Sequence, residues 1–151
     1  MPWRFLEGKT TADAAFQAEG RTIEELFASA AEAVLGTMVA DPLAVAPREE
    51  RTVTLSAESA EMLLFELLQA VIFHKDAERL LLRVAAVSIE RPADRRAGRT
   101  PSAWSCTATL RGERVDPRRH ELLTDVKAVT LQGYRVAPTS GGWEAEVVLD
   151  V

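Results

Sequence analysis

The sequence has few of the features that mark secreted, membrane or disulfide-bonded proteins. Only one of its 151 residues is cysteine, Cys106, so no disulfide can form within the chain, as expected in a reducing cytoplasm. The most apolar stretch, 62–73, is short and is interrupted by Glu66 and Gln69, so we expect no membrane span. Residues 1–7 contain both a base and an acid, which is untypical of a signal peptide. These absences predict a cytoplasmic protein.

The sequence also lacks the motifs of common enzyme classes. It has no glycine-rich phosphate loop, no paired-cysteine zinc pattern and no Ser-His-Asp arrangement that spacing would single out. Its two histidines, His74 and His120, are far apart, and we expect surface or helix-capping roles for them. Cys106 lies in an alternating apolar run, which favours a core thiol over a nucleophile. We therefore assign no catalytic or cofactor-binding residue and expect a protein that is not an enzyme.

Basic residues do not outnumber acidic ones. The net charge of −5 argues against wide contact with a nucleic-acid backbone and is compatible with binding a cation or a basic protein. A local exception is the segment 90–101, which we expect to be an exposed loop and which contains Arg95, Arg96 and Arg99. The sequence leaves open whether these arginines touch RNA.

The patterns that are present predict one compact α+β domain over residues 1–151, with two helices packed on a mixed or antiparallel sheet. The first helix follows the capping box Thr22-Ile-Glu-Glu25 and ends before Asp41-Pro42, and the second begins after Ser59. We expect residues 41–51 to form a connecting segment. Gly112-Glu113 and residues 138–142 are expected to form turns. Alternating or apolar runs predict six or seven strands, at 3–7, 12–19, 52–57, 80–89 (where a helix is the alternative), 104–110, 125–136 and 143–151.

The last nine residues, 143–151, carry the clearest chemical signal. Apolar side chains alternate there with mostly acidic ones, which places Asp150 on the polar face just before the carboxylate that follows Val151. Asp13 projects from the face of its own strand opposite Phe16. Hard oxygens of this kind suit Mg²⁺, Mn²⁺ or Ca²⁺ if the fold brings them together. Taken separately, both aspartates could instead be ordinary turn or edge residues.

Several segments, in this order, resemble the archease family over essentially the whole chain. They are Phe5-Leu-Glu7, Thr11-Ala-Asp-Ala-Ala-Phe16, Gly20-Arg-Thr-Ile-Glu-Glu-Leu-Phe27, Leu63-Leu64, Asp76-Ala-Glu-Arg79, Gly112-Glu-Arg-Val-Asp-Pro117, His120-Glu-Leu122, Asp125-Val-Lys-Ala-Val-Thr130 and Gly141-Gly-Trp-Glu-Ala-Glu-Val-Val-Leu-Asp-Val151.

The resemblance implies a small accessory protein of tRNA splicing. Members assist the RtcB-type RNA ligase by promoting its guanylylation and multiple turnover, so tRNA and GTP are reached through the ligase. The family's metal site, expected to hold Ca²⁺ with Mg²⁺ or Mn²⁺ as alternatives, matches onto Asp13, Asp150 and Val151. An older view of the family is a chaperone-like modulator of tRNA methylation.

One departure from the family pattern lies next to Asp13. Many members have His-Thr-Ala-Asp directly after the Leu-Glu pair, whereas this chain has two extra residues and Thr10 in place of the histidine. We carry over no role for that histidine. Two other hypotheses use the same carboxylates: a small metal-dependent hydrolase, for which the sequence offers no convincing base, and a metal-binding or purely structural interaction module.

Overall fold

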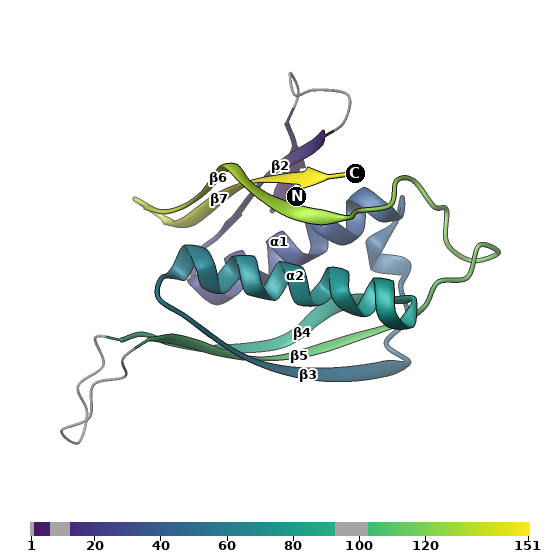
Figure 1. The fold of residues 1–151 in the computed structure, drawn as a ribbon, viewed down its shortest axis with the longest axis horizontal. Helices are drawn as coiled ribbons and strands as arrows, with labels where there is room; N and C mark the ends of the chain where they lie inside the picture. The colour runs from purple at the N-terminus through teal and green to yellow at the C-terminus, as the bar shows by residue number, and fades with distance from the viewer. Residues whose placement is uncertain (1, 7–12, 93–102) are drawn as a thin grey trace.

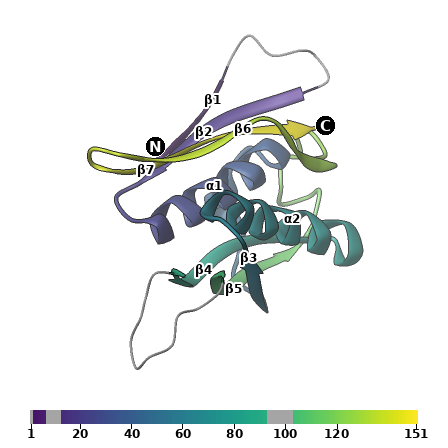
Figure 2. The same ribbon diagram turned by 60° about the vertical axis from the view of Figure 1, so that its left-hand side comes forward.

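Two antiparallel sheets enclose two helices in this protein. The computed structural model describes residues 2–6, 13–92 and 103–151, and Figure 1 shows the helices lying between an upper and a lower sheet. Figure 2 shows the same three layers after a rotation of 60°. The α+β prediction with two helices on antiparallel strands is confirmed, but the strands divide between two sheets, which the sequence did not predict.

The upper sheet contains the first two and the last two strands of the chain. Its order is β1 (Trp3–Phe5), β2 (Asp13–Gly20), β7 (Gly142–Asp150) and β6 (Ala128–Thr139). The predicted hairpin turn does lie between β6 and β7, but it is shorter than 138–142, because residues 138, 139 and 142 belong to the strands. Phe16 of β2 and Val147 of β7 point into the core, as the period of two requires. The opposite face of this sheet carries the charged side chains.

The lower sheet contains the middle of the chain, in the order β3 (Glu49–Ala57), β5 (Trp104–Arg114) and β4 (Leu80–Glu90). Residues 49–51 were expected in a connector but form the start of β3, because Glu49 and Glu50 pair with Gly112 and Arg111. The stretch 80–89 is a strand, not a helix. The predicted turn at Gly112-Glu113 is wrong, since β5 continues to Arg114.

The first helix, α1 (Ile23–Met38), forms where the capping box predicts it. The Thr22 hydroxyl accepts from the Glu25 N–H at 3.1 Å, and the Glu25 carboxylate accepts from the Arg21 N–H at 2.7 Å. Leu26 and Phe27 are fully buried. After α1 the chain makes a short 3-10 turn, η1 (Pro42–Ala44), before it enters β3.

The second helix, α2 (Ala60–Glu78), begins at the predicted cap, where the Ser59 hydroxyl accepts from the Met62 N–H at 3.1 Å. It packs against strands of both sheets, and Leu64, Leu67 and Leu68 are fully buried. Its C-cap, Arg79, has left-handed backbone angles with φ 58°. Within the described residues, no helix is long and apolar enough to cross a membrane.

Candidate functional site

Asp13 and Asp150, near opposite ends of the sequence, lie directly across from each other. Asp13 is the first residue of β2 and Asp150 the last of β7, and their Cα atoms are partners in the antiparallel register. Residues opposite each other in such a pair project to the same face, with Cβ atoms about 4.5–5.5 Å apart. That face is the one opposite Phe16, so the predicted pair of carboxylates is brought together on the outside of the upper sheet.

The backbone of Asp150 is held by a neighbouring strand on each side. Ala128 of β6 is the other partner of Asp150, and the Lys127 N–H donates to the Asp150 carbonyl at 2.8 Å. Lys127 was expected within a strand, but β6 begins one residue later, at Ala128. The Asp150 side chain is exposed, that of Asp13 is half-buried, and the Val151 side chain packs against the core.

A buried lysine of α2 holds the segment that leads to Asp150. The Lys75 ammonium donates to the Asp125 carboxylate and to the Val126 carbonyl, each at 2.7 Å, and to the Asp76 carboxylate. Burial alone would lower the pKa of Lys75, but the hydrogen bonds to Asp125 and Asp76 outweigh it and raise the pKa. Because residues 126 and 127 are adjacent, this lysine anchors the backbone that pairs with Asp150.

Sequence reasoning missed Lys75, although a signal was present. It follows Val71 by four residues and Leu68 by seven, so it continues the apolar stripe of α2. A lysine on the buried face of a helix is expected to donate hydrogen bonds to nearby acceptors, because burying an unpaired charge costs free energy.

The two histidines lie away from the Asp13–Asp150 pair. His74 is half-buried near the end of α2, where its Nδ1 is 2.7 Å from the Glu78 carboxylate. The expectation of a surface position is wrong for His120, which is only 5% exposed. Its Nδ1 accepts from the Asp116 N–H at 2.9 Å, and its Nε2 lies 3.1 Å from the Glu113 carboxylate. This histidine therefore stabilises the turn after β5.

Cys106 is buried in β5, as expected, and burial raises the pKa of its thiol to about 11. A thiol with so high a pKa is a poor nucleophile at neutral pH, because the reactive species is the thiolate. Within the described part of the chain, no arrangement of a nucleophile and a base accompanies the two aspartates.

Residues 3–151 match the model of the family described as "Archease protein family (MTH1598/TM1083)". The chain belongs to the archease family. It is 34% identical to the protein archease of Methanopyrus kandleri over 153 residues, with 100% of both chains covered. It is 31% identical to the protein archease of Methanosarcina mazei, with 93% of this chain and 91% of that one covered.

Two solved structures agree with the archease fold described above. The solution structure of Methanobacterium thermoautotrophicum protein 1598 has a TM-score of 0.79 and 32% identity, with 99% of each chain covered. The crystal structure of an archease from Thermotoga maritima, described as a "possible chaperone", has a TM-score of 0.60 and 20% identity. It covers 97% of this chain and 96% of its own, and at that identity it supports the fold alone.

The donor set of this archease fits a hard divalent cation in kind. Asp13 and Asp150 are carboxylates on one face, and Ca²⁺ takes about 6–8 oxygen ligands, many of them from water or backbone. Among the described residues, no group of three or more His, Cys, Asp or Glu side chains surrounds a common point. A metal site here therefore needs further oxygens, such as a main-chain oxygen of Val151. Metal binding stays a prediction.

Four residues singled out in the sequence lie outside the described residues. Thr10, which replaces the family histidine, falls in 7–12, and Arg95, Arg96 and Arg99 fall in 93–102.

Proposed function

We propose that this archease activates an RtcB-type RNA ligase during tRNA splicing, by promoting guanylylation of the ligase and its multiple turnover. The observation that carries the proposal is the register that sets Asp13 opposite Asp150 in a member of this family. Two carboxylates on an outer sheet face are placed to meet a partner rather than to enclose a substrate. In this role the protein is an accessory factor and not an enzyme.

Asp13, Asp150 and Val151, the last through a main-chain oxygen, are the residues that would hold a divalent cation, Ca²⁺ first and Mg²⁺ or Mn²⁺ as alternatives. A bound cation would supply positive charge toward phosphate oxygens. The chain's own contribution is to present fixed oxygens at the ligase surface, where they orient the ligase's metal and GTP. The histidine that is guanylylated belongs to the ligase. Lys75 and Lys127 support this by fixing the backbone beside Asp150.

The test is the rate of ligase guanylylation by GTP, measured with and without this chain and with two single variants. Asp13→Ala removes one carboxylate of the pair. Glu19→Ala is the matched control, because Glu19 is an exposed carboxylate on the same face of β2 at its other end. We expect faster labelling and repeated turnover with wild type and Glu19→Ala, and neither with Asp13→Ala.

Thermal unfolding of the three proteins supplies the necessary comparison. Asp13 is half-buried and has an interaction within the fold, so Asp13→Ala should lower the free energy of unfolding by about 0.5–1.5 kcal/mol and leave the protein folded. Loss of activation together with loss of folding would contradict the assignment of Asp13 to the site. Calorimetric titration with Ca²⁺, Mg²⁺ and Mn²⁺ identifies the ion.

A second candidate is a chaperone-like modulator of tRNA methylation. The Thermotoga maritima archease, which shares the fold, is described as a "possible chaperone". No stimulation of the ligase by well-folded wild type would support this function, or that of an interaction module, over ligase activation.

A further inference from the structure

A small cavity opens where both helices end. Its volume is about 200 Å³, and it lies between the last residues of α1, the end of α2 and the segment 122–125. A cavity of about 150 Å³ is large enough to hold benzene, so this one can accept a leucine or phenylalanine side chain. Its walls are apolar and polar in nearly equal parts, and the apolar part consists of Met38, Leu81, Val115, Leu122 and Leu123.

Two of the lining residues are leucines whose side chains are about half exposed and whose backbone is fixed by hydrogen bonds. Leu122 and Leu123 are 48% and 52% exposed. The Leu123 N–H donates to the Met38 carbonyl at 2.8 Å, and Leu122 forms a bridge with Val39. The segment is therefore anchored to the end of α1 like a short extra strand. Adjacent apolar side chains kept exposed in this way are typical of a surface that another molecule covers.

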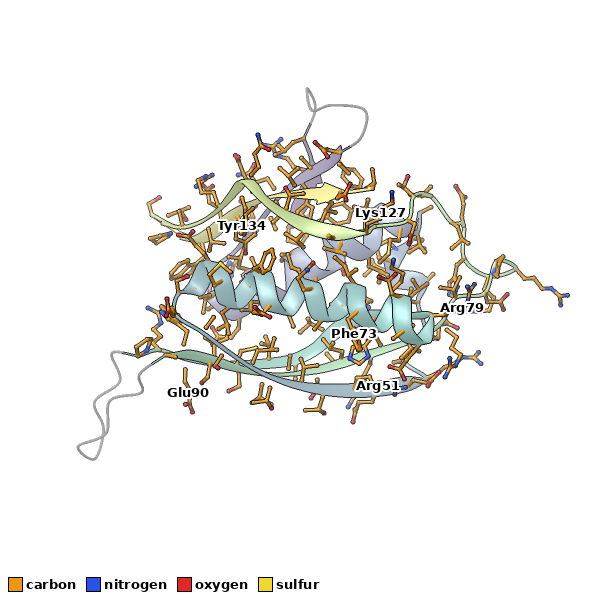
Figure 3. The ribbon with its side chains drawn as sticks, in the orientation of Figure 1. Arg51, Phe73, Arg79, Glu90, Lys127 and Tyr134 are labelled. Atoms are coloured by element: carbon orange, nitrogen blue, oxygen red, sulfur yellow. The ribbon has the colours of Figure 1, made fainter. Side chains whose placement is uncertain are left out.

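The polar groups at the cavity differ in how they are paired. Lys75 is balanced by Asp125 and Asp76, so it offers no free charge. Arg79 is exposed, and no carboxylate among the described residues lies within ion-pair distance of it. Figure 3 shows Arg79 at the end of α2. A partner surface with an apolar side chain next to a carboxylate would complement both the apolar lining of the cavity and the charge of Arg79.

A short stretch of chain also links the cavity to the candidate site. Asp125 lines the cavity, and two residues further on the Lys127 N–H donates to the Asp150 carbonyl. A single partner surface can therefore cover the cavity and approach Asp150 at the same time.

We propose that this cavity is a docking site for an apolar side chain flanked by a carboxylate on the surface of the partner ligase. The inference rests on the proposed function and deepens it, since it separates docking, at the cavity, from activation, at the Asp13–Asp150 pair. Leu122 and Leu123 supply the apolar contact and Arg79 the charge at the rim.

The test measures two quantities for each variant: the Kd for the cognate RtcB-type ligase, and the guanylylation rate when the ligase is saturated with this chain. The double variant Leu122→Ser/Leu123→Ser should raise the Kd at least about tenfold, as expected for an apolar anchor. Its guanylylation rate at saturation should equal that of wild type. Arg79→Gln should raise the Kd about two- to fivefold, as for an exposed charge.

Two control variants make the result specific. Leu131→Ser removes a leucine of β6 that is similarly exposed but lies outside the cavity, and it should leave the Kd unchanged. Asp13→Ala should fail to stimulate the ligase even when the ligase is saturated with it, because it removes a carboxylate of the Asp13–Asp150 pair and leaves the cavity intact. The cavity variants and Leu131→Ser alter exposed side chains and Asp13→Ala alters a half-buried one, and circular dichroism melting establishes that each one folds. Arg79→Gln tests the cavity if the double serine variant does not fold.

The outcomes separate the two proposals. If wild type stimulates the ligase and the cavity variants bind as well as wild type, the docking site is wrong and the proposed function stands. If wild type neither binds nor stimulates the ligase, the proposed function is wrong and the docking site with it. Concentration-dependent dimers that the double serine variant abolishes would assign the cavity to a second copy of this chain and overturn the proposal.

Discussion

Glu113 is a buried carboxylate whose pKa is strongly lowered by the fold. It is 5% exposed, and its carboxylate accepts from Arg119 at 2.7 Å and from the Ala46 N–H at 2.6 Å, with His120 close by. The hydrogen bond from Arg119 is the largest cause that lowers its pKa, to about 2, and it outweighs the effect of burial. This carboxylate therefore ties the start of β3 to the turn after β5.

We expect Glu113→Gln to lower the free energy of unfolding at pH 7 by about 1–3 kcal/mol, because the amide cannot accept from Arg119 and Ala46 as a carboxylate does. The folded-state pKa lies below the ordinary value of 4.5, so the stabilisation is complete above that pH and is lost as the pH falls toward 2. Urea unfolding of both proteins between pH 7 and 2 measures this. A difference that stays constant over that range, or one that Glu121→Gln also produces, would contradict the assignment.

At the scale of one element, β5 is the strand on which the lower sheet depends. It lies between β3 and β4, and Gly112, near its end, is where the backbone of β4 comes closest. A Cβ at this position would lie 1.7 Å from the Leu81 carbonyl oxygen. Glycine is thus required here for close approach of two strands, not for the turn that a Gly-Glu pair suggests.

Gly112→Ala should therefore destabilise the protein by about 3 kcal/mol or more, at or beyond the upper end of overpacking effects, because a backbone oxygen cannot move aside as a side chain can. Gly141→Ala is the control, since a Cβ at Gly141 would meet nothing within 4 Å. Thermal melting of the two variants checks this. Equal melting temperatures would show that β4 can shift away from β5 at little cost.

At the scale of the whole molecule, the core lies between two sheets and is filled by both helices. Cys106, in the central strand of the lower sheet, is 2% exposed and reports on this core. Burial raises the pKa of its thiol to about 11, so little of it is ionised to the reactive thiolate near neutral pH. A reagent can therefore reach the thiol only after the structure opens.

We expect Cys106 to react with a disulfide reagent at pH 8 only as fast as global unfolding allows. Thr107→Cys supplies the comparison within one protein, because residue 107 is the exposed neighbour on the same strand. That variant should show one fast and one slow thiol. The reaction rate of the slow thiol should rise with denaturant concentration in parallel with the equilibrium constant for unfolding. A slow rate that does not change with denaturant would show that the lower sheet opens locally.

Local patterns in the sequence determined the elements and the candidate residues. The caps at Thr22 and Ser59 start helices because a side-chain oxygen satisfies free N–H groups within three residues, which is a local property. Alternation in 143–151 is equally local, and it assigned Asp150 to the outer face and Val147 to the core. Asp13 could be proposed for the same reason.

The tertiary structure alone decided which of these elements meet. Pairing of β2 with β7 spans almost the whole chain, and a slip of one residue would turn Asp150 away from Asp13 while leaving the sequence pattern unchanged. The burial of Lys75, Glu113 and His120, and the close approach at Gly112, likewise depend on neighbours distant in sequence. Periodicity says which way a side chain points along its own strand or helix, but packing decides what it faces.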